Sequence, residues 1–165
     1  YIDWGYLFIY ATMDDLENTE KYFDLVMRNA AKMGEDILVD MIIKNNGLDI
    51  KIYIWKGEYD KAIDLIYASR NSSRDGMQTL LSEAHRLNGN LNRSRQIIMM
   101  MCDDDDYCSI RPQYEAALVY YELGEYSKAR KYLNGYLNHY QHADPEFIDL
   151  IKAQKTLEEW DKAGN

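Results

Sequence analysis

The sequence predicts an all-α fold: a right-handed superhelix of about four helical hairpins, followed by one further C-terminal helix. The first observation is a six-residue phrase, Gly57-Glu58-Tyr59-Asp60-Lys61-Ala62. It returns at 124–129 and, with more changes, at 14–19, 89–94 and 158–163. The steps between successive copies are 43, 32, 35 and 34 residues, and a period of about 34 residues is typical of stacked helical hairpins. The second observation is that only two prolines and nine glycines interrupt the chain, which leaves room for long helices.

Each copy of the phrase predicts a tight turn between two antiparallel helices. Glycine accommodates the turn, the aromatic residue fills the joint, and the small sixth residue lets the helices approach closely. The expected helices span residues 1–13 and 15–33, 36–56 and 59–70, 76–87 and 91–102, 110–123 and 126–140. The last helix is expected to open at Asp144, a favoured N-cap residue, with Pro145 at the first helical position.

One stretch gives a conflicting local signal. Residues 48–55 alternate between apolar and other side chains, which on its own indicates a strand. The repeat places this stretch on the first helix of the second pair, and the turn signal at Gly57 follows where that helix should end. We therefore expect a helix. The long first step of 43 residues is expected to lengthen the helices around residues 30–46.

The repeats predict one domain over residues 1–165, because no linker rich in proline, glycine or serine divides the chain. Its units are expected at roughly 1–42, 43–74, 75–109 and 110–143, with a partial unit at 144–165. The chain begins at Tyr1, and its fifth repeat stops just after the turn signal, so we expect a piece of a longer protein. Trp160 on the last helix is expected to need cover from the rest of that protein or from another copy.

The charge balance narrows the class of partner. The formal net charge is −9, from 28 acidic and 19 basic residues. Nucleic acids and anionic lipids bind positive faces, so neither is expected as the main partner. No apolar run reaches the ~20 residues that a membrane span needs, so no direct membrane insertion is expected. The charge suits a basic or neutral peptide, or serves solubility alone.

The repeated residues resemble the tetratricopeptide repeat family over nearly the whole chain. The pattern is clearest at 110–143 and recurs at 43–74; the residues near the pattern positions are Ala116, Tyr120, Gly124, Tyr126 and Ala129, and Tyr53, Gly57, Tyr59 and Ala62. The chain departs from the family in lacking the proline that usually ends each unit. The first unit also lacks the glycine.

The resemblance implies a concave groove lined by the first helix of each pair. Carried onto this chain, the groove residues are Trp4, Phe8, Lys51, Ile54, Glu83, Arg86, Tyr114, Leu118 and Tyr121. An alternative is that Trp4, Phe8 and Leu118 cover a neighbouring helix. The implied function is a non-catalytic scaffold that binds a protein or peptide. Two alternatives stay open: a peptide-sensing domain of a larger signalling or transcriptional regulator, and a component of pilus or envelope assembly. Association of copies through the terminal helices also stays open.

The segment between the third and fourth pairs holds the strongest local motif, four consecutive aspartates flanked by Cys102 and Cys108. Hard cations such as calcium bind carboxylates, but consecutive aspartates do not converge, so we expect a solvated loop. Whether the cysteines form a disulfide stays open. So does the compartment, where the cytoplasm is favoured over the periplasm.

The chain has no nucleotide-binding loop, nucleophile elbow or metalloprotease signature, and we expect no enzyme activity, metal or cofactor. The run Met99–Met101 is expected in the core.

Overall fold

The computed structural model describes residues 2–13, 15–34, 47–103, 107–144 and 146–164. Within these ranges the regular secondary structure is helical apart from one short pair of strands, and the helices pack against their neighbours. This confirms the all-α class. The chain forms two compact units, Tyr1–Ser72 and Ser73–Asn165, and each is described separately below. Their boundary lies two residues before the expected boundary between the second and third repeats.

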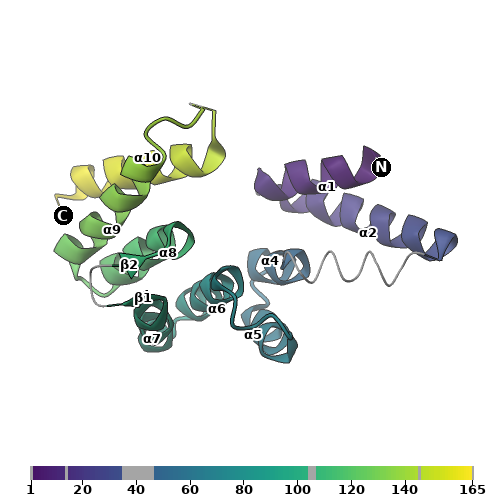
Figure 1. Cartoon of the computed structure of the whole chain (residues 1–165), viewed down its shortest axis with the longest axis horizontal. Helices are drawn as coiled ribbons and strands as arrows, with labels where there is room; N and C mark the ends of the chain where they lie inside the picture. Colours follow the sequence, from purple (N-terminus) through teal and green to yellow (C-terminus); the bar gives the residue numbers. More distant parts are fainter. Residues whose placement is uncertain (1, 14, 35–46, 104–106, 145, 165) are drawn as a thin grey trace. The chain divides into compact units, whose positions relative to one another are not determined.

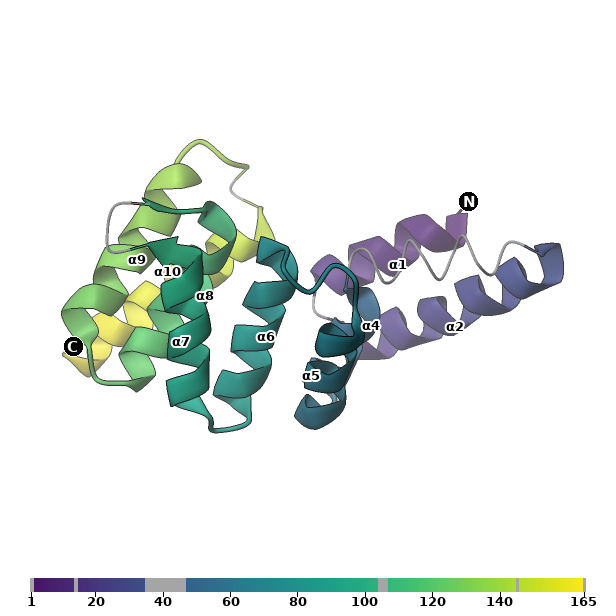
Figure 2. The same ribbon diagram turned by 60° about the horizontal axis from the view of Figure 1, so that its bottom comes forward.

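The N-terminal unit contains four described helices: α1 (Ile2–Thr12), α2 (Leu16–Met33), α4 (Leu48–Trp55) and α5 (Tyr59–Ala68). Helices α1 and α2 lie side by side as a hairpin (Figures 1 and 2), and α4 packs against both α2 and α5. A core of Leu7, Val26, Ala30, Leu48 and Ile52 joins α1, α2 and α4. The first repeat is longer than the others. Most of its extra length falls within residues 35–46, which lie outside the described ranges.

The C-terminal unit contains α6 (Asp75–Leu87), α7 (Leu91–Met101), β1 (Cys102–Asp103), β2 (Tyr107–Cys108), α8 (Ile110–Glu122), α9 (Tyr126–His139) and α10 (Ile148–Ala163). Figure 2 shows α6, α7 and α8 side by side, and α10 packs on α9. The core centres on the fully buried Tyr120, whose ring stacks on Tyr132 at 5.5 Å between centroids.

The glycine-centred turns share one backbone geometry. Gly57, Gly89 and Gly124 all adopt the left-handed conformation, with φ of 74°, 79° and 77°. The residue after each glycine donates its N–H to the carbonyl five residues earlier: Glu58 to Tyr53, Asn90 to His85, and Glu125 to Tyr120, over 2.8–2.9 Å. This is the hydrogen-bond pattern by which a left-handed glycine ends a helix. The phrase therefore encodes the same helix end each time.

The sixth residue of the phrase is fully buried at every turn, as Ala62, Ser94 and Ala129. The faint first copy follows the same plan, because Asp15 donates its N–H to Tyr10 and Thr19 is fully buried in the place of the alanine. The Thr19 hydroxyl has no hydrogen-bond partner there, which shows why alanine suits the position better. The prediction of a turn at the last copy is wrong, since residues 158–163 lie within α10, and Gly164 caps the helix after them.

Residues 48–55 form a helix, α4, despite their alternating pattern. Leu48 and Ile52 are one helical turn apart and face the core shared with α1 and α2. Ile50 and Ile54 are also buried but lie about 200° around the helix axis, since each residue turns the helix by about 100°. Opposite faces of α4 are therefore both buried. Leu48 with Ile52 and Ile50 with Ile54 form two pairs spaced by four residues, and together these pairs produce the alternating pattern.

Two further predictions need correction. Helix α10 begins at Ile148 rather than at Asp144, because Asp144 instead closes a turn in which its carboxylate accepts the N–H of Glu146 at 2.9 Å. The methionine run is also not a core element. Met99 and Met100 are exposed, Met100 to 70%, and only Met101 packs partly against the core. The buried face of this part of α7 is supplied by Ile97 and Ile98.

Candidate partner-binding surfaces

The predicted groove residues of the N-terminal unit differ in their accessibility. Lys51 is half-buried, and its ammonium group lies 5.3 Å from the centre of the Trp55 ring. Ile54 is a buried core residue and offers a partner no open surface. Trp4 and Phe8 fall on α1, but their side chains lie outside the described part of the structure. Of Lys51 and Ile54, only Lys51 lies at a surface as expected.

Arg86, predicted as a groove residue, is an internal link between α6 and α8. Its Nε and Nη2 atoms donate to the two carboxylate oxygens of Glu115 at 2.8 and 3.0 Å, and its Nη1 donates to Glu122 at 2.9 Å. The Arg86 side chain is only 10% exposed. The prediction that it contacts a partner is therefore corrected. Glu83, on the same helix, stays half-buried at the surface.

The Arg86–Glu115 pair lies in a strongly perturbed electrostatic environment. Burial raises the pKa of Glu115 to about 7, against the lowering effect of its hydrogen bonds to Arg86. The neighbouring carboxylates of Glu83 and Glu122 make smaller contributions in the same direction as burial, and the pKa of about 7 includes them. Burial alone would lower the pKa of Arg86, but the carboxylates outweigh that effect and keep the guanidinium charged. Beside the pair, the Ser82 and Ser94 hydroxyls share a buried hydrogen bond of 2.7 Å.

Helix α10 covers much of the predicted groove surface on α8. The Tyr114 hydroxyl and the Thr156 hydroxyl are hydrogen-bonded at 2.9 Å. The ring of Tyr121 stacks on Trp160 with 4.3 Å between centroids and 3° between planes. Trp160 is thereby buried, so the expectation that it needs cover from outside the chain is wrong. Leu118 is half-buried and packs against the same core.

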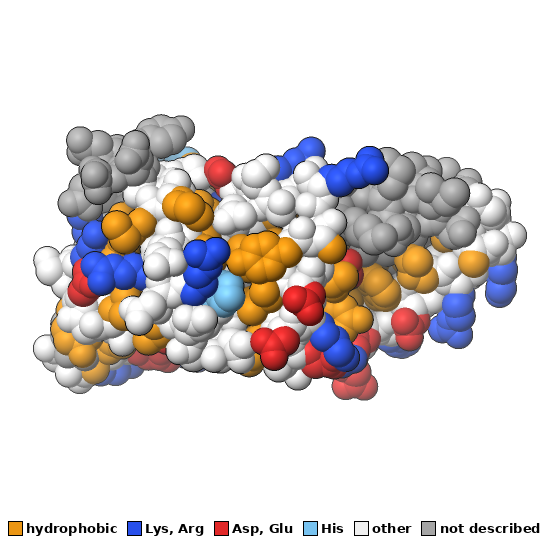
Figure 3. All heavy atoms as spheres, turned by 90° about the horizontal axis from the view of Figure 1, so that it is seen from below, with side chains coloured by type: hydrophobic (Ala, Val, Ile, Leu, Met, Phe, Trp, Pro, Cys, Tyr) orange, Lys and Arg blue, Asp and Glu red, His pale blue; other side chains and the backbone are white. Residues whose placement is uncertain are grey.

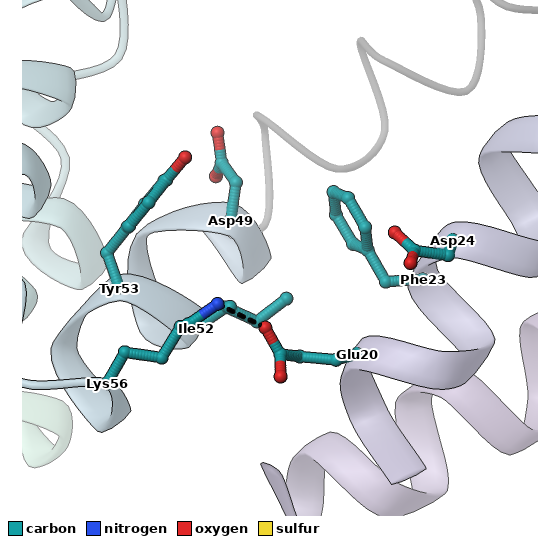
Figure 4. A pocket seen from close by; sticks show the side chains of 7 residues that line it. All are labelled: Glu20, Phe23, Asp24, Asp49, Ile52, Tyr53 and Lys56. Atoms are coloured by element: carbon teal, nitrogen blue, oxygen red, sulfur yellow. Dashed lines mark hydrogen bonds and ion pairs between the residues drawn. The ribbon is translucent and has the colours of Figure 1, made fainter. Parts of the chain in front are cut away.

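A pocket of about 170 Å³ lies in the N-terminal unit between α2 and α4. Glu20, Phe23 and Asp24 line it from α2, and Asp49, Ile52, Tyr53 and Lys56 line it from α4 and its C-terminal end. Figure 4 shows Phe23 and Tyr53 rising from the two helices and the ion pair of Lys56 with Glu20 crossing between them, at 2.6 Å. The hydrogen bond to Glu20 raises the pKa of Lys56.

The pocket was missed at the sequence level, although a periodic signal for it exists. Glu20 and Asp24 are four residues apart on α2, and Asp49, Tyr53 and Lys56 follow each other at four and three residues. These spacings place each set on one helix face. What the sequence does not show is that the two faces meet, because that depends on how α4 packs on α2.

The segment after α7 resolves the open question about the cysteines. Cys102 and Cys108 form a disulfide, and they also pair with each other in the antiparallel ladder of β1 and β2. The bond closes a six-residue separation at the end of α7. Residues 104–106 lie outside the described residues, so the expectation of a solvated aspartate loop, like its calcium-binding alternative, remains a prediction.

Figure 3 shows apolar side chains interspersed with charged ones on one face of the molecule. No helix in the described ranges has the length and apolar character to cross a bilayer. Comparisons with protein-family models, curated protein sequences and solved structures gave no match to the chain.

Proposed function

We propose that the chain is a non-catalytic binding module of the tetratricopeptide type, which holds a protein or peptide along the first helices of its hairpins. The observation that carries the proposal is the recurrence of one helix-ending turn at residues 10–19, 53–62, 85–94 and 120–129. A hairpin of this size buries its apolar face only against neighbouring hairpins, so repetition generates an extended surface. Such surfaces bind helices and extended peptides.

The surface left for a partner is smaller than the sequence alone suggests. Arg86 and Ile54 are committed to packing, and Tyr114 and Tyr121 contact α10. The side chains of Lys51, Glu83 and Leu118, one on each of α4, α6 and α8, are half-buried and so partly accessible. We therefore propose Lys51 as the described contact position of the N-terminal unit, and Glu83 and Leu118 as those of the C-terminal unit.

Photo-crosslinking tests the proposal directly. A photoreactive phenylalanine analogue replaces Lys51, Glu83 or Leu118, one at a time, in the full chain expressed in its native cells. The matched controls carry the analogue at Gln96 or Met100, which are exposed on the second helix α7. We expect a protein adduct from each of the first three positions and none from the controls. The same adduct from α7, or no adduct from α4, α6 and α8, would refute the proposal.

The disulfide favours one of the alternatives, a component of pilus or envelope assembly. Disulfides persist in oxidising compartments and are rare in the cytosol, where a transcriptional regulator acts. We propose on this basis that the chain works outside the reducing cytosol.

We expect the protein from acid-quenched native cells to keep both cysteines protected from alkylation until a reductant is added. Replacing both with serine should lower the free energy of unfolding by about 2 kcal/mol, because the cross-link no longer restricts the unfolded chain. Immediate alkylation of both thiols would instead place the chain in a reducing compartment.

A further inference from the structure

We infer that one face of α1 binds the same face of a second copy of the chain, as an antiparallel pair of helices related by a twofold axis at Ile9. This surface, called here the outward face of α1, consists of five exposed residues: Gly5, Tyr6, Ile9, Thr12 and Met13. Met13 continues the helical hydrogen bonding, because its N–H donates to the Ile9 carbonyl at 3.0 Å. The inference goes beyond the proposed peptide binding and does not depend on it.

The outward face of α1 lies opposite the core. Helix α1, seen beside α2 in Figure 1, buries Leu7 and Ala11 in the core that it shares with α2 and α4. Since each residue turns the helix by about 100°, the five outward residues span an arc of about 120° centred opposite these two. That side of a helix usually carries charged residues. Here Tyr6, Ile9 and Met13 are 43%, 51% and 54% exposed, which marks an interaction surface.

The order of side-chain sizes along this face selects a second copy as the partner. Gly5 and Met13 lie four residues on either side of Ile9, and the next two, Tyr6 and Thr12, lie three residues on either side of it. A twofold axis at Ile9 therefore places Met13 of one copy opposite Gly5 of the other. Tyr6 likewise faces Thr12. Each large side chain meets a small one, as in helices that interdigitate, and a face that complements itself closes a dimer.

Gly5 leaves room for the Met13 side chain of the other copy. A Cβ atom added at Gly5 would meet no atom of the described residues within 4 Å. Glycine destabilises the interior of a helix relative to alanine, and no contact within the described part of the chain calls for it here. The close approach of a second helix would use the space, and methionine adapts its shape to fill such a gap.

Tyr6 and Thr12 are already positioned for the contact by their own chain. The Tyr6 ring stacks against the rings of Tyr10 and Tyr22, with 6.2 and 5.2 Å between centroids, so a partner that covers it orders little that is free. The Thr12 hydroxyl donates to the Ile9 carbonyl at 2.7 Å, which leaves the Thr12 methyl group for a partner. The contact therefore requires no rearrangement of these two side chains.

The charge of the chain also favours contact between copies at this face. The formal net charge is −9, so two copies repel each other over much of their surfaces. None of the five outward residues is charged, so their contact buries no carboxylate and needs no ionic partner. One helix per copy supplies less than the ~800 Å² per partner of a stable complex, so we expect a weak dimer with a dissociation constant of about 10–100 µM.

The test is sedimentation equilibrium of the full chain over a concentration range centred on the expected dissociation constant. Two variants, Ile9→Lys and Ile9→Glu, each place like charges face to face across the axis and should weaken the dimer at least tenfold. An equimolar mixture of the two variants should restore dimers, because the lysine of one copy then faces the glutamate of the other. Such recovery requires that Ile9 of one copy lies opposite Ile9 of the other.

Two further sets of variants separate this contact from general effects of charge and folding. Gly5→Leu fills the space that Met13 would occupy and should weaken the dimer about tenfold without adding a charge. Ile151→Lys and Ile151→Glu add the same charges at an apolar residue of α10 that is 46% exposed, and should leave the dissociation constant within about twofold. Circular dichroism first establishes that every variant keeps the helical fold.

A chain that stays monomeric at ten times the expected dissociation constant would overturn the inference and leave the outward face of α1 to a different partner. Equal weakening by the Ile9 and Ile151 variants would also overturn it, because the contact would not be specific to α1. Weakening by both Ile9 variants with no recovery in their mixture would refute the twofold arrangement. The crosslinks from α4, α6 and α8 can succeed or fail independently of these results.

Discussion

Replacement of Arg86 by alanine should lower the free energy of unfolding by about 3–5 kcal/mol at pH 8. The guanidinium makes two hydrogen bonds to the buried carboxylate of Glu115 and a third to Glu122. Removal of one partner from a buried ion pair leaves the other charge in a poorly solvated place with no compensation. Denaturant-induced unfolding, followed by circular dichroism, measures the loss.

The loss should depend on pH in a definite direction. Burial already raises the pKa of Glu115 in the folded protein from 4.5 to about 7, and removal of the guanidinium raises it further. The folded state then binds a proton more tightly than the unfolded chain. The stability that this proton contributes is fully present below about pH 4.5 and is lost as the pH rises through the folded-state pKa. The effect of Arg86→Ala should therefore be smaller at pH 5 than at pH 8.

Two controls separate charge burial from lost packing. Arg130 also joins two helices, through an ion pair with Asp161, but the pair is more exposed, and Arg130→Ala should cost less than about 1 kcal/mol. The double variant Arg86→Met with Glu115→Leu removes both buried charges and should recover most of the loss. An Arg86→Ala loss that is the same at pH 5 and pH 8, or that the double variant does not recover, would contradict the role assigned to the pair.

The hairpin turns could be predicted from the sequence because their signals are local. A left-handed glycine ends the first helix, and a small residue five positions later lets the second helix pack closely against the first. Gly57 with Ala62 and Gly124 with Ala129 are the two clearest cases. The last copy of the phrase lacks the glycine, and there the helix continues through it. The prediction failed where the residue that permits the left-handed conformation was missing.

The candidate surfaces were harder to predict because exposure depends on contacts far along the chain. Arg86 carries no local sign of being buried, and its partner Glu115 lies 29 residues away on the next hairpin. A lone carboxylate in the apolar run around Tyr114–Tyr120 was the one available hint. The groove positions Tyr114 and Tyr121 on α8 were misjudged for the same reason, since both meet α10, Tyr114 at Thr156 and Tyr121 at Trp160. Helical periodicity assigns a face, but it does not identify the element that covers it.

Replacement of Trp160 by alanine should lower the free energy of unfolding by about 3–5 kcal/mol, the range found when a large buried aromatic side chain is truncated. Trp160 is buried, stacks on Tyr121 at 4.3 Å and joins the core that contains Ala153. The Tyr114–Thr156 hydrogen bond also joins α8 and α10, but it is half-buried and cannot replace the lost apolar contact. Helix α10 should therefore detach before the rest of the unit unfolds.

Hydrogen exchange of the backbone amides shows which helices lose stability in this variant. In Trp160→Ala, the amides of α10 should exchange much faster while those of α6 and α7 change little, because the lost contact joins α10 to α8 and local opening follows the loss of local contacts. Trp160→Phe keeps a ring against Tyr121 and should recover part of the stability, whereas Ile151→Ala on the exposed face should cost at most about 0.5 kcal/mol. Detachment would also uncover Tyr121, so light scattering should show more association in the alanine variant than in the original chain. Unchanged exchange in α10 would mean that this stacking does not hold the helix in place.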